Sequence, residues 1–285
     1  MKGEIVNFFT SDGLQLYGFL SGDKNKVGII YLHGMTGNFY WKDFVSLLSE
    51  IASRNKIGLL AFGNRGAGMI GNFHTKNGKG KTIGTNLEKF EDCIKDIDAA
   101  VSFMRKRGFK KIFLAGHSTG CQKAAYYMAK TNDKKVHGII LLAPADDYNI
   151  NKKEFGSKMK RLLLTAKSMM RAGKGNELMP EYSKGIPYSA QRLNSIIDLK
   201  RAEAQIFNYD SDLKFVKKIR VPILAVFGSK EQHAIIKPQK MLNMIRAASK
   251  VPCKTLLIKG GNHSFKGKEK QVVNVIVNWV KKCQQ

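Results

Sequence analysis

Short, uninterrupted apolar runs alternate with amphipathic segments along this chain, and that alternation restricts its fold more than any other feature. A strand that is apolar at every position has both faces buried, which is typical of a parallel sheet covered by helices on both sides. The pattern therefore predicts an α/β protein with a mostly parallel sheet. The runs of strand length lie at residues 28–32, 58–62, 111–115, 138–143, 223–227 and 255–258.

The segments outside these runs complete the expected sheet and its helical layers. Residues 4–21 read as two antiparallel strands around a turn at residues 11–13. Helices are expected over residues 41–54 and 271–282, where apolar residues recur at steps of three and four. Residues 69–84 are rich in Gly, Asn and Lys, so we expect a loop there.

A further helix is expected to begin with a capping box. Thr85 and Glu88 have the Thr-x-x-Glu spacing in which two side chains satisfy free backbone amides at a helix start. Apolar residues then recur at helical spacing from Leu87 to Met104, which predicts one buried stripe against the sheet.

Residues 148–212 interrupt the alternation of strands and helices. They contain no good strand and several amphipathic helical stretches. An insertion that follows the carboxyl end of a strand lies over the edge where open α/β sheets bind ligands. We therefore expect a helical cap over residues 148–212, inserted after the sixth strand of a core formed by residues 1–147 and 213–285. Leu163 and Met169 are expected to line its substrate pocket.

The motif Gly-x-Ser-x-Gly at residues 116–120 stands between an apolar strand and a helical segment. A sharp turn between strand and helix exposes the serine hydroxyl, and glycines on either side let the backbone segments approach each other. The context predicts that Ser118 is a nucleophile. The Thr119 amide then points toward the same space and is expected to be one oxyanion donor.

Ser118 needs a base and a group that orients it. Of the six histidines, His263 follows the last strand in a Gly-rich loop, on the same sheet edge as the serine, and it is the expected base. Glu231 follows a strand and lies between Ser118 and His263 in chain order, so it is the favoured acid. Asp146 and Asp147, after the preceding strand, are the alternatives.

A second oxyanion donor is expected in the loop that follows the first parallel strand. Gly34 permits an unusual backbone turn there, so the Met35 amide can point inward. His33 ends the same strand, and we expect it to brace this loop and border the substrate pocket.

The charge and cysteine content limit the partners and the compartment. Lys and Arg number 49 against 22 Asp and Glu, a net charge of +27. The excess is mostly Lys and is spread along the chain, so we expect the positive charge to attract anionic substrates and expect no specific nucleic-acid site. No apolar stretch is long enough for a membrane span. Four scattered cysteines and no metal-ligand motif predict a cytoplasmic protein without metal or cofactor.

Five short motifs lie at the ends of the expected strands: His-Gly at 33–34, Asn-Arg-Gly-Ala-Gly at 64–68, the serine motif at 116–120, Gly-Ser-Lys-Glu at 228–231 and Gly-Asn-His-Ser-Phe at 261–265. With these motifs, nearly the whole chain resembles the α/β-hydrolase superfamily. The resemblance implies an eight-stranded sheet, a helical cap and a triad of Ser118, Glu231 and His263. The short loop after His33 is similar to those of carboxylesterases and acylglycerol lipases, and residues 116–122 are weakly similar to a fungal group that includes siderophore esterases.

The combined interpretation is a serine hydrolase that cleaves carboxylic esters or thioesters through an acyl-enzyme. Two alternatives remain at this point. The same triad serves hydrolysis of amides at peptide termini, and a hydrolase fold also serves as a binding protein without catalysis. Acyl-chain length, physiological substrate and oligomeric state do not follow from the sequence.

Overall fold

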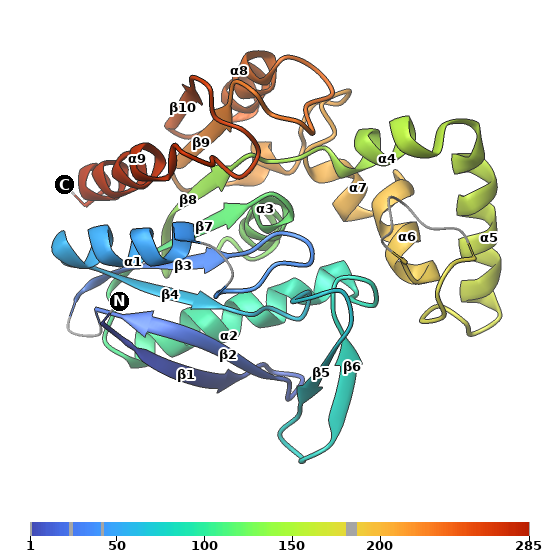
Figure 1. The fold of residues 1–285 in the computed structure, drawn as a ribbon, viewed down its shortest axis with the longest axis horizontal. Helices are drawn as coiled ribbons and strands as arrows, with labels where there is room; N and C mark the ends of the chain where they lie inside the picture. Colours follow the sequence, from blue (N-terminus) through green and yellow to red (C-terminus); the bar gives the residue numbers. More distant parts are fainter. Residues whose placement is uncertain (1, 23–24, 41–42, 181–186, 285) are drawn as a thin grey trace.

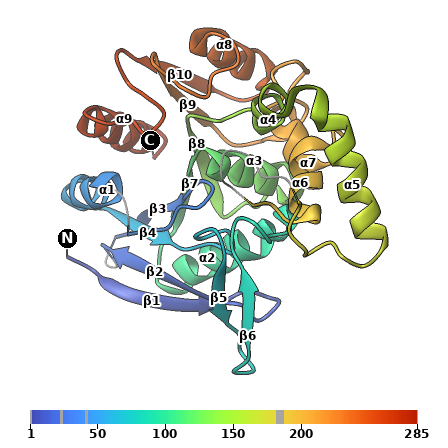
Figure 2. The same ribbon diagram turned by 45° about the vertical axis from the view of Figure 1, so that its right-hand side comes forward.

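An eight-stranded sheet with the order β1-β2-β4-β3-β7-β8-β9-β10 forms the centre of the protein (Figures 1 and 2). The computed structural model describes residues 2–22, 25–40, 43–180 and 187–284. β2 pairs antiparallel with β1 and β4, and all other neighbours in this sheet pair parallel. The strands of this sheet are β1 (Glu4–Phe9), β2 (Gln15–Ser21), β3 (Val27–Leu32), β4 (Ile57–Phe62), β7 (Lys111–His117), β8 (Val136–Leu142), β9 (Ile223–Gly228) and β10 (Cys253–Ile258).

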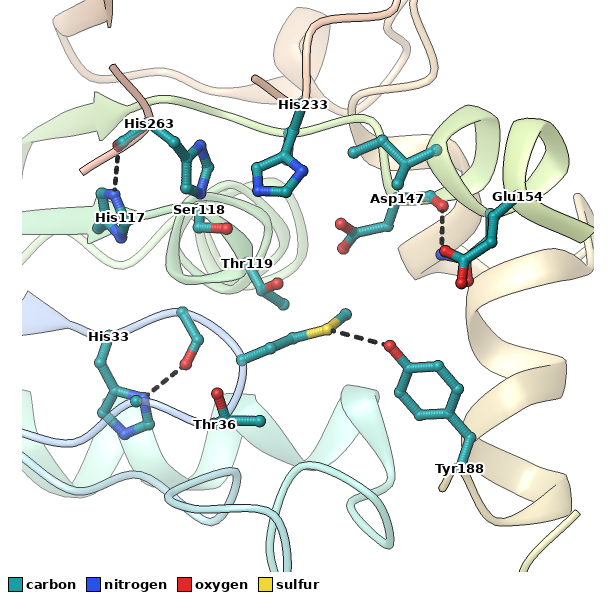
Figure 3. Close-up of a pocket in the computed structure, with 16 residues that line it drawn as sticks. His33, Thr36, His117, Ser118, Thr119, Asp147, Glu154, Tyr188, His233 and His263 are labelled. Carbon is teal, nitrogen blue, oxygen red and sulfur yellow. Dashed lines mark hydrogen bonds between the residues drawn. The ribbon is translucent and has the colours of Figure 1, made fainter. Parts of the chain in front are cut away.

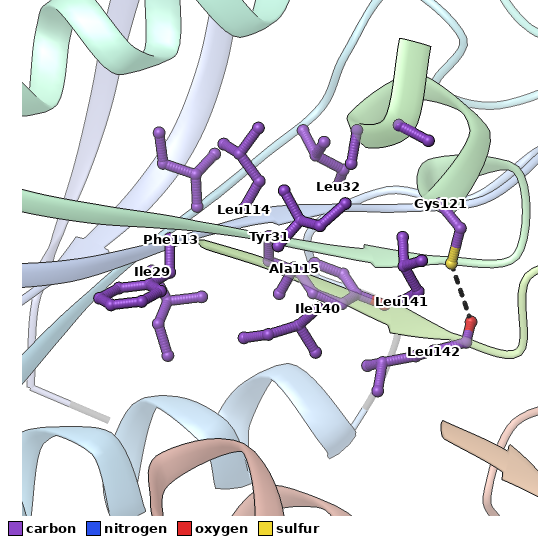
Figure 4. Close-up of a cluster of buried hydrophobic side chains, with 14 of the residues drawn as sticks. Ile29, Tyr31, Leu32, Phe113, Leu114, Ala115, Cys121, Ile140, Leu141 and Leu142 are labelled. Carbon is purple, nitrogen blue, oxygen red and sulfur yellow. Dashed lines mark hydrogen bonds between the residues drawn. The ribbon is translucent and has the colours of Figure 1, made fainter. Parts of the chain in front are cut away.

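Helices cover both faces of this sheet, as the continuous apolar strands predict. α1 (Asp43–Arg54) and α9 (Glu269–Lys282) pack against each other on one face. α2 (Cys93–Lys106) and α3 (Thr119–Thr131) cover the other face, and Figure 4 shows the strands between the two layers. α8 (Pro238–Ala248) packs against β9 and β10 at one end of the sheet. The predicted fold class is confirmed.

Strands β3, β7 and β8 owe their apolar composition to burial on both faces. Ile29, Ile30, Phe113, Leu114 and Ile140 are fully buried. Successive residues of a strand point to opposite faces, so Phe113 reaches the α9 layer, where its ring meets Trp279 at 5.8 Å between centroids, while Leu114 lies on the opposite side (Figure 4).

Two local predictions in residues 69–88 are wrong. Residues 71–83 form an antiparallel hairpin rather than a loop, with strands β5 (Gly71–His74) and β6 (Gly80–Ile83). Its strands are largely exposed, so they carry no apolar run that the sequence pattern could reveal.

The capping box is also absent. The Thr85 hydroxyl donates to the Gly66 carbonyl at 2.7 Å and accepts from the Thr36 amide at 2.7 Å, so it braces two loops instead of a helix start. The helix begins later, as the turn η1 (Phe90–Asp92) that leads into α2. Trp41, the first residue of the helix expected over residues 41–54, lies outside the described residues, and α1 begins at Asp43.

The segment between β8 and β9 is helical and lies beyond the carboxyl ends of the parallel strands (Figure 1). We call α4–α7 the helical insertion; residues 181–186 within it lie outside the described ranges. It has an apolar cluster of its own, in which Leu162, Leu193 and Ile196 are buried. Its elements and the turn after them are α4 (Asp147–Phe155), η2 (Gly156–Lys158), α5 (Met159–Arg171), α6 (Ala190–Ile197), α7 (Ala202–Ile206) and η3 (Val216–Lys218).

Helix length and composition also bear on membrane association. Within the described ranges, every helix is too short or too polar to cross a bilayer.

Candidate active site

Ser118 occupies a strained turn between β7 and α3. Its φ of 53° and ψ of −126° are a combination that residues with a side chain rarely adopt. A Cβ at Gly116 would lie 2.3 Å from the Gly120 carbonyl oxygen, and one at Gly120 would lie 2.1 Å from the Leu32 carbonyl oxygen. Only glycine fits at both positions, so the motif at residues 116–120 is required by the packing of strand, turn and helix.

His263 lies in the turn after β10 and is oriented by Glu231, which follows β9. The His263 Nδ1–H donates to Glu231 Oε1 at 2.8 Å. The Glu231 side chain is 2% exposed, and its Oε1 also accepts from the His233 amide at 3.0 Å. Because the carboxylate occupies Nδ1, the other ring nitrogen, Nε2, is left to accept a proton. His263 and Ser118 both line one pocket (Figure 3).

Two neighbouring side chains hold the His263 turn in place. Its amide donates to Gln232 Oε1 at 2.8 Å. The His117 Nε2–H donates to the His263 carbonyl oxygen at 2.8 Å, and the two rings are 4.9 Å apart between centroids. His117, which the sequence analysis did not select, therefore lines the pocket and ties the serine turn to the histidine turn.

The two alternative acids are used elsewhere. Asp146 is the N-cap of α4 and accepts hydrogen bonds from the Asn149 amide at 2.9 Å, the Asn149 side chain at 3.0 Å and the Tyr209 amide at 2.9 Å. Asp147 accepts from Gln122 Nε2 at 2.7 Å and lines the pocket. The acid bonded to His263 is Glu231.

The loop after β3 comes very close to the serine. A Cβ at Gly34 would lie 2.9 Å from the Ser118 Cβ and 3.4 Å from its Oγ, so a larger residue would crowd the hydroxyl. Met35 follows Gly34 and lines the pocket together with Thr119, the first residue of α3. The backbone segments that contain the two expected oxyanion donors therefore both border Ser118.

His33 supports this loop from below. Its Nδ1–H donates to the Gly34 carbonyl at 2.8 Å, and its Nε2 accepts from the Asn64 amide at 3.1 Å. It borders the pocket, as expected, but it is 3% exposed and has both ring nitrogens engaged. The His33 side chain therefore supports the loop, and its ring nitrogens are not available to bind a ligand.

A buried ion network lies under the same loop. Lys123 Nζ donates to Asn64 Oδ1 at 2.9 Å and to Glu88 Oε2 at 2.7 Å, and Arg192 lies 3.5 Å from Glu88 Oε1. Burial alone would raise the pKa of Glu88, but the charges of Lys123 and Arg192 hold it below its ordinary value. Arg192 also pairs with Glu203 of α7, so the network joins α3 to the helical insertion.

The pocket has a volume of about 380 Å³ and lies between the sheet edge and the insertion. Figure 3 shows Ser118 and His263 at one side and Tyr188 at the other, with its hydroxyl 3.6 Å from the Met35 sulfur. The described lining residues are His33, Gly34, Met35, Thr36, Gly37, His117, Ser118, Thr119, Ala145, Asp147, Ile150, Asn151, Glu154, Tyr188, His233 and His263.

Four of these residues lie on one face of α4, and the sequence analysis named only one of them, Asp147, as an alternative acid. Asp147, Ile150, Asn151 and Glu154 are spaced by three, four and seven residues, and this spacing brings them to one side of a helix. The same spacing was visible in the sequence, directly after an apolar strand.

The expected pocket residues Leu163 and Met169 are absent from this described lining. Both lie on α5 and pack against the apolar cluster of the insertion. The amphipathic face of α5 is covered by α6, so its apolar residues hold the insertion together instead of facing Ser118.

No group of three or more His, Cys, Asp or Glu side chains within the described residues is arranged to hold a metal ion.

This sheet order, with two antiparallel strands at one edge and a strained serine turn after the fifth strand, is that of the α/β-hydrolase fold. The family of the chain is established by its sequence. The chain belongs to the family described as "Protein of unknown function (DUF1749)", whose model matches residues 84–283. None of the curated proteins matches the chain.

Several solved structures share the fold over almost their whole length. Est1E from Butyrivibrio proteoclasticus, solved with bound ferulic acid, has a TM-score of 0.69 at 18% identity, covering 96% of this chain and 98% of its own. The α/β hydrolase GrgF from Penicillium sp. sh18 has a TM-score of 0.70 at 17% identity, covering 99% of both chains. The esterase Pf2001 from Pyrococcus furiosus has a TM-score of 0.66 at 13% identity, covering 100% of this chain and 91% of its own.

Proposed function

We propose that this protein is a serine hydrolase of carboxylic esters or thioesters. Ser118 is the nucleophile, His263 the base and Glu231 the acid that orients the base. The amides of Met35 and Thr119 form the oxyanion hole. The observation that carries the proposal is the hydrogen bond from His263 to the buried Glu231, at a pocket that His263 shares with a serine in a strained turn.

The reaction follows from the placement of these groups. Ser118 Oγ attacks the substrate carbonyl carbon while His263 Nε2 accepts its proton. The carbonyl oxygen becomes an oxyanion, which the Met35 and Thr119 amides stabilise. The tetrahedral intermediate collapses when His263 returns the proton to the leaving alcohol or thiol, and the acyl group stays on Ser118. Water then attacks the acyl-enzyme with His263 as base, releasing the carboxylic acid and restoring the serine.

Glu231 acts through His263 in each of these steps. It holds the Nδ1–H of the ring, so Nε2 is the nitrogen that faces the reaction. Its negative charge also stabilises the imidazolium that forms after proton transfer. Glutamate in place of the more usual aspartate has one more methylene, and the turn after β9 places it within 2.8 Å of His263.

The similar structures support an ester as substrate, since Pf2001 is an esterase and Est1E was solved with bound ferulic acid. We further propose that residues 148–212 form a cap that selects the substrate. This is supported by the α4 residues in the pocket lining and by Tyr188, which faces the serine from the opposite side. The four cysteines are free, which supports a reduced, cytoplasmic compartment.

The direct test is covalent labelling with a fluorophosphonate probe, read by intact mass. We expect one adduct on the wild type and none on Ser118→Ala, together with loss of hydrolysis of p-nitrophenyl butanoate. Ser53→Ala, on the exposed face of α1, is the matched control and should label like the wild type. Labelling of Ser118→Ala equal to that of the wild type would contradict the assignment of the nucleophile.

A further inference from the structure

The part of the pocket away from Ser118 offers hydrogen-bond acceptors from one face of α4. Figure 3 shows Asp147 pointing into the pocket near His233 and Thr119, with Glu154 further along the same helix. Asn151 lies between them in the chain and is 5% exposed. Its Nδ2 donates to the Asp147 carbonyl at 2.7 Å, which leaves Oδ1 as an acceptor that is buried and lacks a hydrogen-bond partner within the described structure.

The ionisable groups of this region differ from those of the whole chain. Lys and Arg outnumber Asp and Glu by 49 to 22, yet the described lining residues include two carboxyl groups and neither Lys nor Arg. Lys152 and Lys153 of the same helix are exposed on its other side. The pocket lining therefore gives no support to the anionic substrate expected from the net charge.

A buried acceptor without a donor is costly, at about 1–3 kcal/mol, so such groups are usually met by water or by a ligand. Three acceptor side chains within one helical stripe fit a ligand group with several N–H donors and no acceptor. A primary ammonium has three donors and a positive charge that suits a carboxylate.

We propose that Asp147, Asn151 and Glu154 form a subsite that binds a primary ammonium group of the substrate, at a distance from the scissile ester bond. This inference rests on the proposed function, because it names the class of ester that the Ser118 site accepts. The substrate is then an ester with an amine on its acyl or alcohol part.

The electrostatics of Asp147 agree with this subsite. Burial raises the pKa of Asp147 to about 8, and the charge of Glu203 on α7 adds to the rise, while Arg192 on α6 opposes it. A bound ammonium would offset both the burial and the repulsion from Glu203. An additional negative charge at the same place would increase the repulsion.

The test compares esters of equal size that differ in one terminal group. p-Nitrophenyl 6-aminohexanoate carries an ammonium where p-nitrophenyl heptanoate has a methyl group and the 6-hydroxyhexanoate ester has a hydroxyl. A second series has the same groups at the end of the alcohol part of a butanoate ester. We expect kcat/KM for the ammonium ester to exceed that of its methyl and hydroxyl counterparts about tenfold or more in at least one series, as for a hydrogen bond to a charged group.

Variants that remove a carboxylate test whether the preference for the ammonium ester arises at the proposed subsite. Glu154→Gln and Asp147→Asn should each lower the ratio of ammonium to methyl ester about tenfold, because each removes one carboxyl from the subsite. Glu177→Gln removes an equal charge from the same insertion, but Glu177 is exposed and lies outside the described pocket lining. This control variant should keep the wild-type ratio.

A binding measurement separates this inference from the proposed function. Titration calorimetry of Ser118→Ala protein with hexylammonium, hexanol and hexanoate needs no turnover, and hexylammonium should bind most tightly, with weaker binding when Glu154→Gln is added. Equal binding of the three ligands, or an ammonium preference that survives both subsite variants, would overturn the subsite. If hexylammonium binds as expected but neither Ser118 labelling nor ester hydrolysis is found, the subsite stands and the proposed hydrolase function is wrong.

Discussion

Replacing Glu231 by glutamine distinguishes an orienting acid from an ordinary buried carboxylate. Glu231 Oε1 accepts from the His263 Nδ1–H and from the His233 amide, so the glutamine oxygen can keep both hydrogen bonds in the same position. What is lost is the negative charge beside the imidazolium that forms during the reaction. Two opposite unit charges about 4 Å apart attract each other by about 4 kcal/mol at an effective dielectric constant of about 20. We therefore expect kcat to fall by about 10³.

The matched comparison is Asp146→Asn, which, like Glu231→Gln, replaces one carboxylate oxygen by an amide nitrogen, here in the alternative acid. Asp146 Oδ1 accepts from the Asn149 amide, and Oδ2 accepts from the Asn149 side chain and the Tyr209 amide. An asparagine amide nitrogen must face at least one of these donors. The free energy of unfolding should fall by about 1–3 kcal/mol, with kcat near that of the wild type.

The assay is steady-state hydrolysis of p-nitrophenyl butanoate together with thermal unfolding of each variant. Glu231→Gln should lose turnover with little change in Tm, and Asp146→Asn should lose several degrees in Tm, at about 2–4 °C per kcal/mol, with turnover kept. If Glu231→Gln retained its kcat, or if Asp146→Asn lost kcat at an unchanged Tm, the reasoning that assigns the orienting role to Glu231 would be refuted.

Three further changes test the packing and electrostatics around the site. Gly120→Ala would place a Cβ 2.1 Å from the Leu32 carbonyl and should lower the free energy of unfolding by about 1–3 kcal/mol or more, whereas Gly175→Ala, with its nearest contact at 3.7 Å, should leave Tm near the wild-type value. The folded-state pKa of Asp147 is raised to about 8 from an ordinary 3.8, so this group makes the free energy of unfolding fall as pH rises between these values, by at most about 1.4 kcal/mol per pH unit. The difference in Tm between Asp147→Asn and the wild type should therefore shift in favour of the variant from pH 5 to pH 8. A difference that stays constant would contradict the raised pKa. Leu163→Ala should lower the free energy of unfolding by about 1 kcal/mol and leave the kcat/KM ratio of butanoate to octanoate esters unchanged. A changed ratio would show that Leu163 contacts the substrate.

Features that depend on neighbouring residues were predictable from the sequence. The apolar run of β7, the glycines at 116 and 120 and the start of α3 lie within a few residues of Ser118, so the strained turn is a local property. Glu231 and His263 could be selected because each follows a strand, and parallel strands bring their carboxyl ends to one edge of the sheet. Their roles in catalysis remain predictions.

The tertiary structure decided which distant side chains meet. Glu88 lies near Lys123 and Arg192, 35 and 104 positions away, and no periodicity in the chain encodes these contacts. The apolar spacing of α5 was correct, but only the packing against α6 shows that Leu163 faces the insertion's own core. A helical pattern specifies which residues share a face, and the packing of the whole chain determines what that face contacts. For this reason the sequence predicted the serine, its strand and its helix, whereas the acidic face of α4 in the pocket emerged from the three-dimensional arrangement.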